Sequence, residues 1–224
     1  MNSFKKTAWN DLISKYLKEG YLSALDIGTG PGFFSIILSE LGLDVTGMDC
    51  SDEMLKEAER NIDVAGYKAK FINGDCHEVS FGEETFDFII CRNLVWTLVN
   101  PQKAYNEWYR VLKQGGRLVV IDANWFLRLS DELAFKKYEQ VQKKARELGY
   151  LEREISKTQE EECIKIAKNL PLTYEKRPKW DEKALLECGF KDVVVEEDIS
   201  EQVYDDRQKV LYGYAPLFVV SATK

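Results

Sequence analysis

Histidine and long apolar runs are both scarce in this sequence. His77 is its only histidine, so a Ser-His-Asp triad or a multi-histidine metal site would have to be built around that one side chain. A Cys76-His77-Glu78 metal site is disfavoured because adjacent residues cannot easily aim at one ion, and we expect no metal. No stretch approaches the roughly 18 apolar residues of a membrane span, and the N-terminus lacks the apolar core of an export signal. These absences predict a cytoplasmic protein with no membrane partner.

Cationic clusters and paired cysteines are also missing. Lys and Arg together number 31 against 38 Asp and Glu, for a formal net charge of −7. Because binding to phosphate backbones depends on clustered cations, this charge disfavours a nucleic-acid partner. None of the five cysteines forms a C-x-x-C pair, and an odd number of cysteines without an export signal indicates reduced thiols.

The apolar residues that are present suffice for one core. The chain has 224 residues, 45% of them hydrophobic, which allows one full core with a lid but not two catalytic domains. Between residues 23 and 124, short β-branched runs alternate with helical segments, which indicates an α/β fold with a parallel sheet. Strands are predicted at 23–28, 44–49, 69–75, 86–91 and 117–122, the last after a Gly115-Gly116 turn, and helices at 31–41, 51–66 and 101–113.

The second half of the chain breaks this alternation. Two amphipathic helices are predicted at 131–148 and 160–170, where apolar residues recur at helical spacing. A helix at 181–188 and strands at 192–199 and 217–222 then resume the sheet. We therefore predict three parts: an N-terminal helix and cofactor-binding half (1–124), a helical cap inserted after strand five (125–177), and a final helix with the last two strands (178–224). The cap and the N-terminal helix are both candidates to cover a ligand.

A glycine-rich turn follows the first predicted strand. Gly28, Gly30 and Gly32 stand between a strand and a helix, where glycine permits a tight turn and a close backbone approach to a ligand. The dinucleotide fingerprint G-x-G-x-x-G/A is not met, because Phe33 occupies its third position. The P-loop pattern G-x-x-x-x-G-K-[ST] is absent as well. A nucleotide-like cofactor other than NAD or ATP is therefore indicated.

Polar residues end several other predicted strands. Asp49 ends the second strand, where an acidic side chain accepts hydrogen bonds from ribose hydroxyls. Asp75 and Cys76 end the third strand, and Arg92 and Asn93 follow the fourth. Because ligands of open parallel sheets bind outside the carboxyl ends of the strands, these segments are expected to converge on one crevice.

Together these segments resemble the class I S-adenosylmethionine-dependent methyltransferases over nearly the whole chain. The resemblance rests on L-D-I-G-T-G-P-G at 25–32, M-D-C-S-D-E-M-L at 48–55, N-G-D-C at 73–76, F-D-F-I-I-C-R-N at 86–93 and Y-R-V-L-K-Q-G-G-R-L at 109–118. It implies a doubly wound, mostly parallel seven-stranded sheet of the Rossmann-like methyltransferase type, with one of the last two strands antiparallel. The implied cofactor is S-adenosylmethionine.

The resemblance also implies which residues hold the cofactor. Gly28, Gly30 and Gly32 would face the methionine portion, with Arg92 and Asn93 at the methionine end. Asp49 would bind the ribose, Cys50 and Met54 the adenine faces, and Asp75, next to Cys76, the exocyclic amine. Asp26 completes the predicted set, either by contacting the cofactor amine or by tying down its own loop.

Other residues admit two interpretations. Asp87 begins a strand and is interpreted as structural, and Cys50 and Cys76 as small apolar packing residues. Trp96 and Trp125 follow strands four and five and either line an acceptor pocket or belong to the core. If the acceptor must lose a proton, His77, Glu78 or Tyr138 is a candidate base, but no catalytic residue is assigned.

The predicted function is methyl transfer to an O, N or C atom of a small-molecule acceptor by direct in-line displacement. Such a reaction needs alignment and exclusion of water rather than an enzyme nucleophile. Two alternatives stay open: a cofactor-binding module that is not catalytic or that activates a partner, and a nicotinamide-dependent oxidoreductase, which Phe33 disfavours. The residues do not identify the acceptor.

Overall fold

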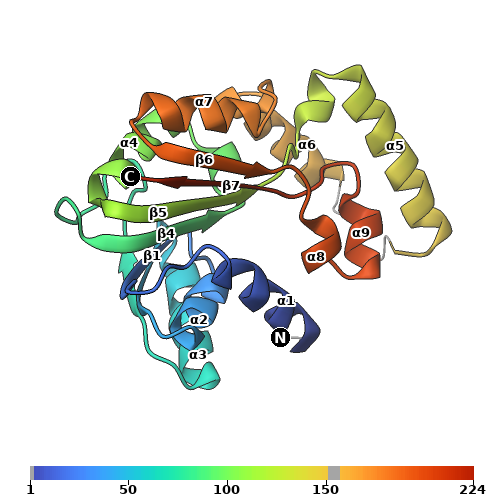
Figure 1. Ribbon diagram of the computed structural model, residues 1–224. Coiled ribbons are helices and arrows are strands. Elements are labelled where there is room, and N and C mark those ends of the chain that lie inside the picture. Colours follow the sequence, from blue (N-terminus) through green and yellow to red (C-terminus); the bar gives the residue numbers. More distant parts are fainter. Residues whose placement is uncertain (1–2, 151–156) are drawn as a thin grey trace.

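A computed structural model describes residues 3–150 and 157–224 of the chain (Figure 1). The strands are β1 (Ser23–Ile27), β2 (Asp44–Asp49), β3 (Lys70–Asn73), β4 (Phe86–Arg92), β5 (Leu112–Asp122), β6 (Lys191–Glu196) and β7 (Phe218–Thr223). The α-helices are α1 (Ser3–Ser14), α2 (Phe33–Glu40), α3 (Asp52–Ala65), α4 (Pro101–Val111), α5 (Glu132–Glu147), α6 (Lys157–Ala167), α7 (Lys179–Glu187), α8 (Ser200–Val203) and α9 (Asp206–Tyr212). Three short 3-10 helices are η1 (Val95–Thr97), η2 (Leu127–Leu129) and η3 (Pro171–Thr173).

The described residues form one seven-stranded sheet in the order β3-β2-β1-β4-β5-β7-β6. Strands β1 to β5 pair in parallel, and β7 is antiparallel to both β5 and β6. The strand order reverses beside β1, which in open α/β sheets is where ligands bind. The predicted fold class, a doubly wound and mostly parallel sheet with one antiparallel strand, is confirmed.

Helices cover both faces of the sheet (Figure 1). Because side chains alternate along a strand, β4 supplies both cores: Ile89 lies in the cluster with α4 and α7, and Ile90 in the cluster with α1 and α2. Trp108 of α4 is fully buried in the first cluster, and Trp9 of α1 is buried in the second. The N-terminal helix is thus a packed part of the fold.

Local capping explains where the helices begin. The Ser51 hydroxyl accepts a hydrogen bond from the Met54 N–H at the start of α3, and Gly66 ends this helix in the left-handed conformation. Asn100 caps α4 ahead of Pro101, and the Asp131 carboxylate caps α5 through the Ala134 N–H. These side chains satisfy N–H groups that the first turn of a helix leaves unpaired.

Three predicted strand boundaries, in β3, β5 and β6, differ from the structure by two residues or more. β3 ends at Asn73 rather than at residue 75. β5 begins at Leu112, which pairs with Phe86, so Gly115-Gly116 forms an irregularity inside β5 rather than a turn before it. The backbone of Lys224 explains this, because it bonds to both glycines at 3.1 Å.

β6 also differs from the prediction, because it ends at Glu196 and the chain then turns into α8 and α9. The Asp198 carboxylate accepts a hydrogen bond from the Ser200 N–H at 2.8 Å, which favours a turn over continued strand. The α9 helix carries a capping box formed by Asp205 and Gln208. Neither short helix was predicted.

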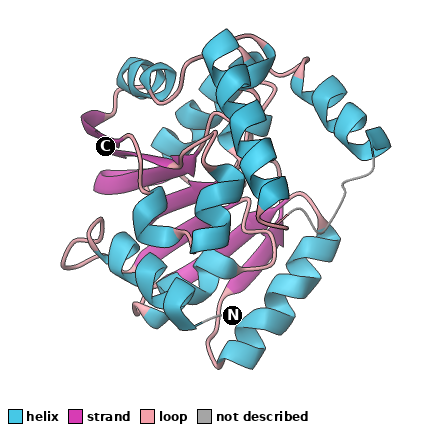
Figure 2. Ribbon diagram, turned by 90° about the vertical axis from the view of Figure 1, so that its right-hand side faces the viewer, coloured by secondary structure: helices cyan, strands magenta, loops and turns pink. Residues whose placement is uncertain are grey.

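The segment predicted as a cap contains α5 and α6, which lie beyond the carboxyl ends of the parallel strands (Figure 1). Figure 2 looks onto that end of the molecule, where helices stand in front of the sheet. Residues 151–156 of the predicted cap and 1–2 of the N-terminal part lie outside the described residues. Among the residues that are described, no helix combines the length and apolar character of a membrane span.

Candidate cofactor and acceptor site

The glycine turn after β1 leaves one glycine open to a ligand. The N–H groups of Gly28 and Thr29 both donate to the Met48 carbonyl, at 2.7 and 3.0 Å. Gly28, Gly30 and Gly32 all have positive φ, a conformation in which other residues are strained. A Cβ atom would contact neighbouring side chains at Gly28 and Gly32, but at Gly30 it would meet no atom within 4 Å. The turn thus exposes backbone at Gly30, as a bound cofactor requires.

The Asp49 carboxylate lies against this turn. Its Oδ2 accepts a hydrogen bond from the Gly30 N–H at 2.9 Å, and its Oδ1 accepts one from the Ser51 N–H at 3.0 Å. A carboxylate has about four acceptor sites, so Asp49 can hold the turn and still accept hydrogen bonds from a ligand diol. The side chain is half-buried at the carboxyl end of β2.

Asp26 is buried behind the turn. Its Oδ2 accepts hydrogen bonds from the Thr29 hydroxyl at 2.7 Å and the Ser35 hydroxyl at 2.8 Å. Burial raises the pKa of Asp26 to about 6, although both hydroxyl groups act to lower it. These are the contacts of a residue that ties its loop to α2, which was one of the two interpretations left open.

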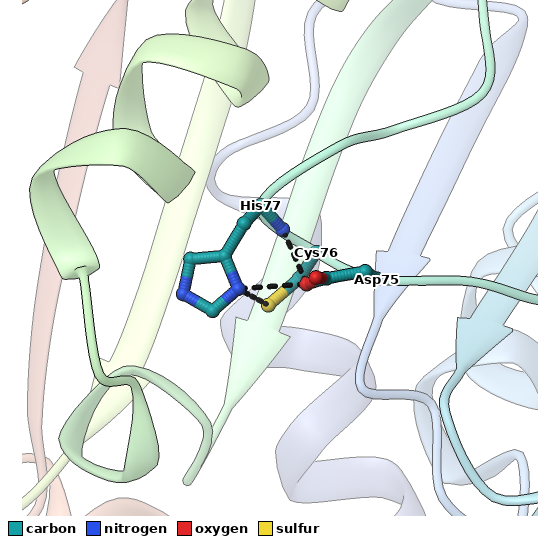
Figure 3. A group of neighbouring side chains, drawn as sticks. All are labelled: Asp75, Cys76 and His77. Atoms are coloured by element: carbon teal, nitrogen blue, oxygen red, sulfur yellow. Dashed lines mark hydrogen bonds and ion pairs between the residues drawn. The ribbon is translucent and has the colours of Figure 1, made fainter.

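Asp75, Cys76 and His77 lie together after β3 (Figure 3). The His77 N–H donates to Asp75 Oδ1 at 2.8 Å, and His77 Nδ1 lies 2.7 Å from the same oxygen. These hydrogen bonds lower the pKa of the exposed Asp75. Within the described chain, the potential ligand atoms of these three residues lie within 4.8 Å of one another. Glu78 instead pairs with Lys103 at 2.5 Å, so the structure does not bring the Cys76-His77-Glu78 set together.

Arg92 and Asn93, at the end of β4, each present an unpaired polar group. The Arg92 guanidinium lies 5.0 Å from the Trp9 ring and 5.6 Å from the Phe33 ring, and burial lowers its pKa. No carboxylate in the described part of the chain forms an ion pair with it. Asn93 has a φ of 53°, and its buried Oδ1 has no hydrogen-bond partner among the described residues. A buried acceptor without a partner is costly, and a half-buried cation without an ion-pair partner precedes it in the chain, which points to a ligand at this position.

Trp96 and Trp125 line the same pocket beyond β4 and β5. Its other walls are the neighbouring residues Ala123, Asn124, Phe126, Leu127, Leu172, Thr173 and Arg177. The Trp96 ring packs 5.2 Å from Phe126, and the Trp125 ring 5.8 Å from Tyr212 of α9. The pocket therefore joins the loops that follow both strands to the segment ahead of α7.

A buried ionic cluster behind this pocket was missed by the sequence analysis. Arg177 donates to Asp122 at 2.5 Å and to both carboxylate oxygens of Asp181 at 2.7 and 2.8 Å. Tyr105 donates to Asp181 at 2.5 Å, and Asp122 also accepts from the Trp96 backbone N–H at 3.1 Å. All three charged side chains are almost completely buried. The available signal in the sequence was Asp122, an acidic residue at the end of a predicted strand. No motif near Asp122 in the sequence indicates that Arg177 is its partner.

The remaining predicted residues lie elsewhere. Cys50 and Met54 are exposed at the start of α3, and Cys76 is half-buried, with burial raising its pKa to about 12. Tyr138 donates to Glu160 at 3.3 Å and, like His77 and Glu78, does not line the tryptophan pocket. Asp87 bonds to Ser23 and Lys113 at the start of the sheet, and these bonds, against the effect of partial burial, lower its pKa to about 2.

Comparisons with known proteins agree with this arrangement. Residues 25–120 match a methyltransferase domain family. A demethylmenaquinone methyltransferase of Thermus thermophilus is 34% identical over 100 residues, covering 44% of this chain and 46% of that protein. A glycine/sarcosine N-methyltransferase of Aphanothece halophytica is 28% identical over 210 residues, covering 90% and 79%. The matches span about half the length of the first curated relatives.

The fold likeness extends over nearly the whole chain. Phosphoethanolamine N-methyltransferase 2 of Haemonchus contortus, solved in complex with S-adenosyl-L-methionine, superposes with a TM-score of 0.63 at 18% identity, covering 96% of this chain and 52% of that one. Sheet order, glycine turn, the acid that ends β2 and the matched methyltransferase domain all agree with the resemblance to the class I S-adenosylmethionine-dependent methyltransferases.

Proposed function

We propose that this protein transfers a methyl group from S-adenosylmethionine to an O, N or C atom of a small-molecule acceptor. When bound, the cofactor would supply an electrophilic methyl group attached to a sulfonium. The acceptor would attack this methyl carbon in line with the carbon–sulfur bond, and the sulfur would leave as a neutral thioether. The chain's own task is to hold and align the reactants, which is worth roughly 7–11 kcal/mol in well-oriented reactions. Relatives named for glycine, demethylmenaquinone and phosphatidylethanolamine methylation support a small-molecule acceptor.

The observation that carries the proposal is the pair of unpaired groups at the end of β4. The methionine end of the cofactor bears a carboxylate and an ammonium group. Arg92 offers a half-buried guanidinium without an anionic partner in the described chain, and Asn93 offers a buried acceptor without a donor. The two groups are therefore complementary to an α-amino acid. Asp49, on the other side of Gly30, is in this proposal the acceptor for the ribose hydroxyls.

A comparison of two ligands tests this assignment. 5′-Methylthioadenosine keeps the adenosine and sulfur of S-adenosylmethionine but lacks the amino-acid end. Hydrogen bonds to charged groups contribute about 1.5–3 kcal/mol, so Arg92→Met should weaken S-adenosylmethionine binding by roughly 10- to 150-fold. The same substitution should leave 5′-methylthioadenosine binding nearly unchanged. Calorimetry on both ligands makes this measurement.

Two controls sharpen the result. Asn93→Gly removes the amide while permitting the positive φ of residue 93, and it should show the same selectivity for the longer ligand. Equal losses for both ligands would indicate a general disturbance of the site and contradict the assignment. A screen of small acceptors with methyl-labelled S-adenosylmethionine then distinguishes a methyltransferase from a cofactor-binding module that turns over no acceptor.

A further inference from the structure

The turn after β3 brings three potential metal ligands together. Asp75, Cys76 and His77 place an oxygen, a sulfur and a nitrogen near one another (Figure 3). From this arrangement we infer that the three side chains form a binding site for zinc or another divalent ion that accepts a thiolate ligand. The proposed methyl transfer does not require a metal, so the inference goes beyond the proposed function and does not rest on it.

A tight turn explains how three neighbours in the sequence can face one point. Adjacent side chains of an extended chain point in opposite directions, which is why the sequence alone disfavours a metal site here. In the structure the Glu78 N–H donates to the Asp75 carbonyl at 3.0 Å, and the His77 N–H donates to Asp75 Oδ1 at 2.8 Å. The Asp75 side chain is thereby folded over the turn, towards the His77 ring.

The separations of the three ligand atoms are close to those around a zinc ion. Zinc binds sulfur at about 2.3 Å and nitrogen or oxygen at about 2.0–2.2 Å, so the ligands of a tetrahedral ion lie roughly 3.3–3.6 Å apart. His77 Nδ1 lies 2.7 Å from Asp75 Oδ1 and 3.8 Å from Cys76 Sγ, and all three atoms lie within 4.8 Å of one another. Small rotations of these side chains bridge the difference.

The following helix, α4, holds the turn in place. Trp108 Nε1 donates to the Cys76 carbonyl at 3.0 Å, and the Trp108 side chain is completely buried. The Glu107 carboxylate accepts a hydrogen bond from the Val79 N–H at 3.2 Å. The backbone on both sides of His77 is therefore anchored in the protein itself, and ligands on an anchored backbone are more precisely placed for an ion.

The charge of the site suits a divalent cation. Burial raises the pKa of the Cys76 thiol to about 12, with contributions from the charges of Asp75, Cys50 and Asp49. A thiolate is unfavourable here on its own, but a coordinated metal ion deprotonates a thiol outright. On binding, the sulfur forms a bond to the metal and its proton passes to water. One thiolate and one carboxylate then balance the two positive charges, and the His77 ring binds in its neutral form.

The donor set selects the class of ion. Thiolate and imidazole ligands favour zinc and similar ions, whereas magnesium and calcium prefer oxygen ligands. Asp75 is exposed, so water can supply a fourth ligand. Both hydrogen bonds that the Asp75 carboxylate accepts from described residues go to Oδ1. Its Oδ2 therefore stays available for the adenine amine that the family resemblance assigns to Asp75.

A hydrogen bond between Asp75 and His77 without any metal is the alternative. This pair alone would leave the Cys76 thiol dispensable, whereas a metal of the proposed class needs the sulfur as a ligand. Substitution of Cys76 therefore separates the two interpretations.

Cobalt(II) is a suitable probe, because it occupies zinc sites and its bond to a thiolate gives a charge-transfer band in the near ultraviolet. The whole chain, without an affinity tag, is freed of metal with a chelator and titrated with Co²⁺. We expect a thiolate–cobalt band that Zn²⁺ abolishes and that excess Mg²⁺ leaves unchanged. Cys76→Ser should abolish the band. Asp75→Asn and His77→Gln should weaken cobalt binding by at least roughly 10-fold, because even residues that only orient a ligand contribute that much.

Cys163→Ser is the matched control, because Cys163 is an exposed thiol on α6, and it should leave the band intact. Absence of the band in the wild type would overturn the inference. A band that survives in Cys76→Ser and disappears in Cys50→Ser would overturn it as well, and displacement of cobalt by Mg²⁺ would contradict the class of ion. Circular dichroism checks that each variant folds. Binding of S-adenosylhomocysteine is measured separately, so a failure of the proposed function is recognised independently of this test.

Discussion

Asp26 illustrates how one buried carboxyl group couples the cofactor turn to pH. Its pKa is raised from 3.8 to about 6, chiefly by burial, so in the folded protein it stays protonated where the unfolded chain has already ionised. The folded state therefore loses stability relative to the unfolded state as the pH rises through this interval. Below about 4 and above about 6 the contribution of this group is constant.

Asp26→Asn should remove that pH dependence. The amide oxygen can accept the same hydroxyl hydrogen bonds but does not titrate. The free energy of unfolding of the variant minus that of the wild type should increase between pH 4 and pH 6, by up to about 3 kcal/mol at 1.36 kcal/mol per pKa unit. Urea denaturation at a series of pH values measures this difference. A difference independent of pH would show that Asp26 does not titrate in this window.

Among the elements, α5 and α6 contribute little to the core. Ala145 is the buried residue of α5, and of α6 only Ala167 is buried among its described side chains. The residues that we propose bind the cofactor lie instead on β1, β2, β4 and their loops. Removal of the two helices should therefore affect acceptor turnover more than cofactor binding.

Replacement of residues 131–170 by a short glycine-serine linker tests this expectation. S-adenosylhomocysteine should still bind, within about 10-fold of the wild-type affinity, a margin of about 1.4 kcal/mol. Methyl transfer should be lost because the site no longer excludes water. Calorimetry and a labelled-methyl assay give the two readouts. Wild-type turnover in the shortened protein would refute a role of these helices as a lid.

At the element scale, prediction succeeded where a local signal was strong. Ser51 and Gly66 cap the two ends of α3, as their positions in the sequence predicted. The predicted strand at 44–49 coincides with β2. It failed where tertiary pairing decides the boundary. The Gly115-Gly116 pair was read as a turn, yet the backbone of Lys224 pairs with it in β5. The valines at 193–195 and the apolar Ile199 indicated one continuous strand and concealed the turn that Asp198 makes with Ser200.

At the scale of the whole molecule, the Arg177 cluster joins parts of the chain that precede and follow α5 and α6. Asp122 ends β5, whereas Arg177 and Asp181 belong to the α7 region. Removal of one partner from a buried ion pair typically costs 3–5 kcal/mol, because the remaining charge is left unpaired. The cluster is thus a stabilising link between the first and last parts of the sheet.

Arg177→Met should accordingly lower the free energy of unfolding by about 3–5 kcal/mol at neutral pH. Lys136→Met is the matched control, because Lys136 pairs with Glu132 at 2.6 Å on the exposed surface of α5, where such pairs contribute about 0–1 kcal/mol. Urea denaturation of both variants makes the comparison. A loss below 1 kcal/mol for Arg177→Met would contradict the assigned role of the cluster.

The candidate site shows the same division between local and distant information. Gly30 and Asp49 belong to short motifs, so the sequence alone indicated them, and they meet in the structure. The contact between Arg177 and Asp122 spans 55 positions, and the two helices of the predicted cap lie between them in the chain. No spacing rule connects such residues, because only the folded sheet brings them together.

The position of β7 has a consequence for biosynthesis. This strand is completely buried between β5 and β6, and it is translated after both of its neighbours. While the ribosome is still adding the intervening helices, the edge of β5 that pairs with β7 in the folded protein has no partner strand. Exposed strand edges of this kind promote aggregation. We expect nascent chains stalled before residue 218 to depend on chaperones, and chains released after β7 to fold without them.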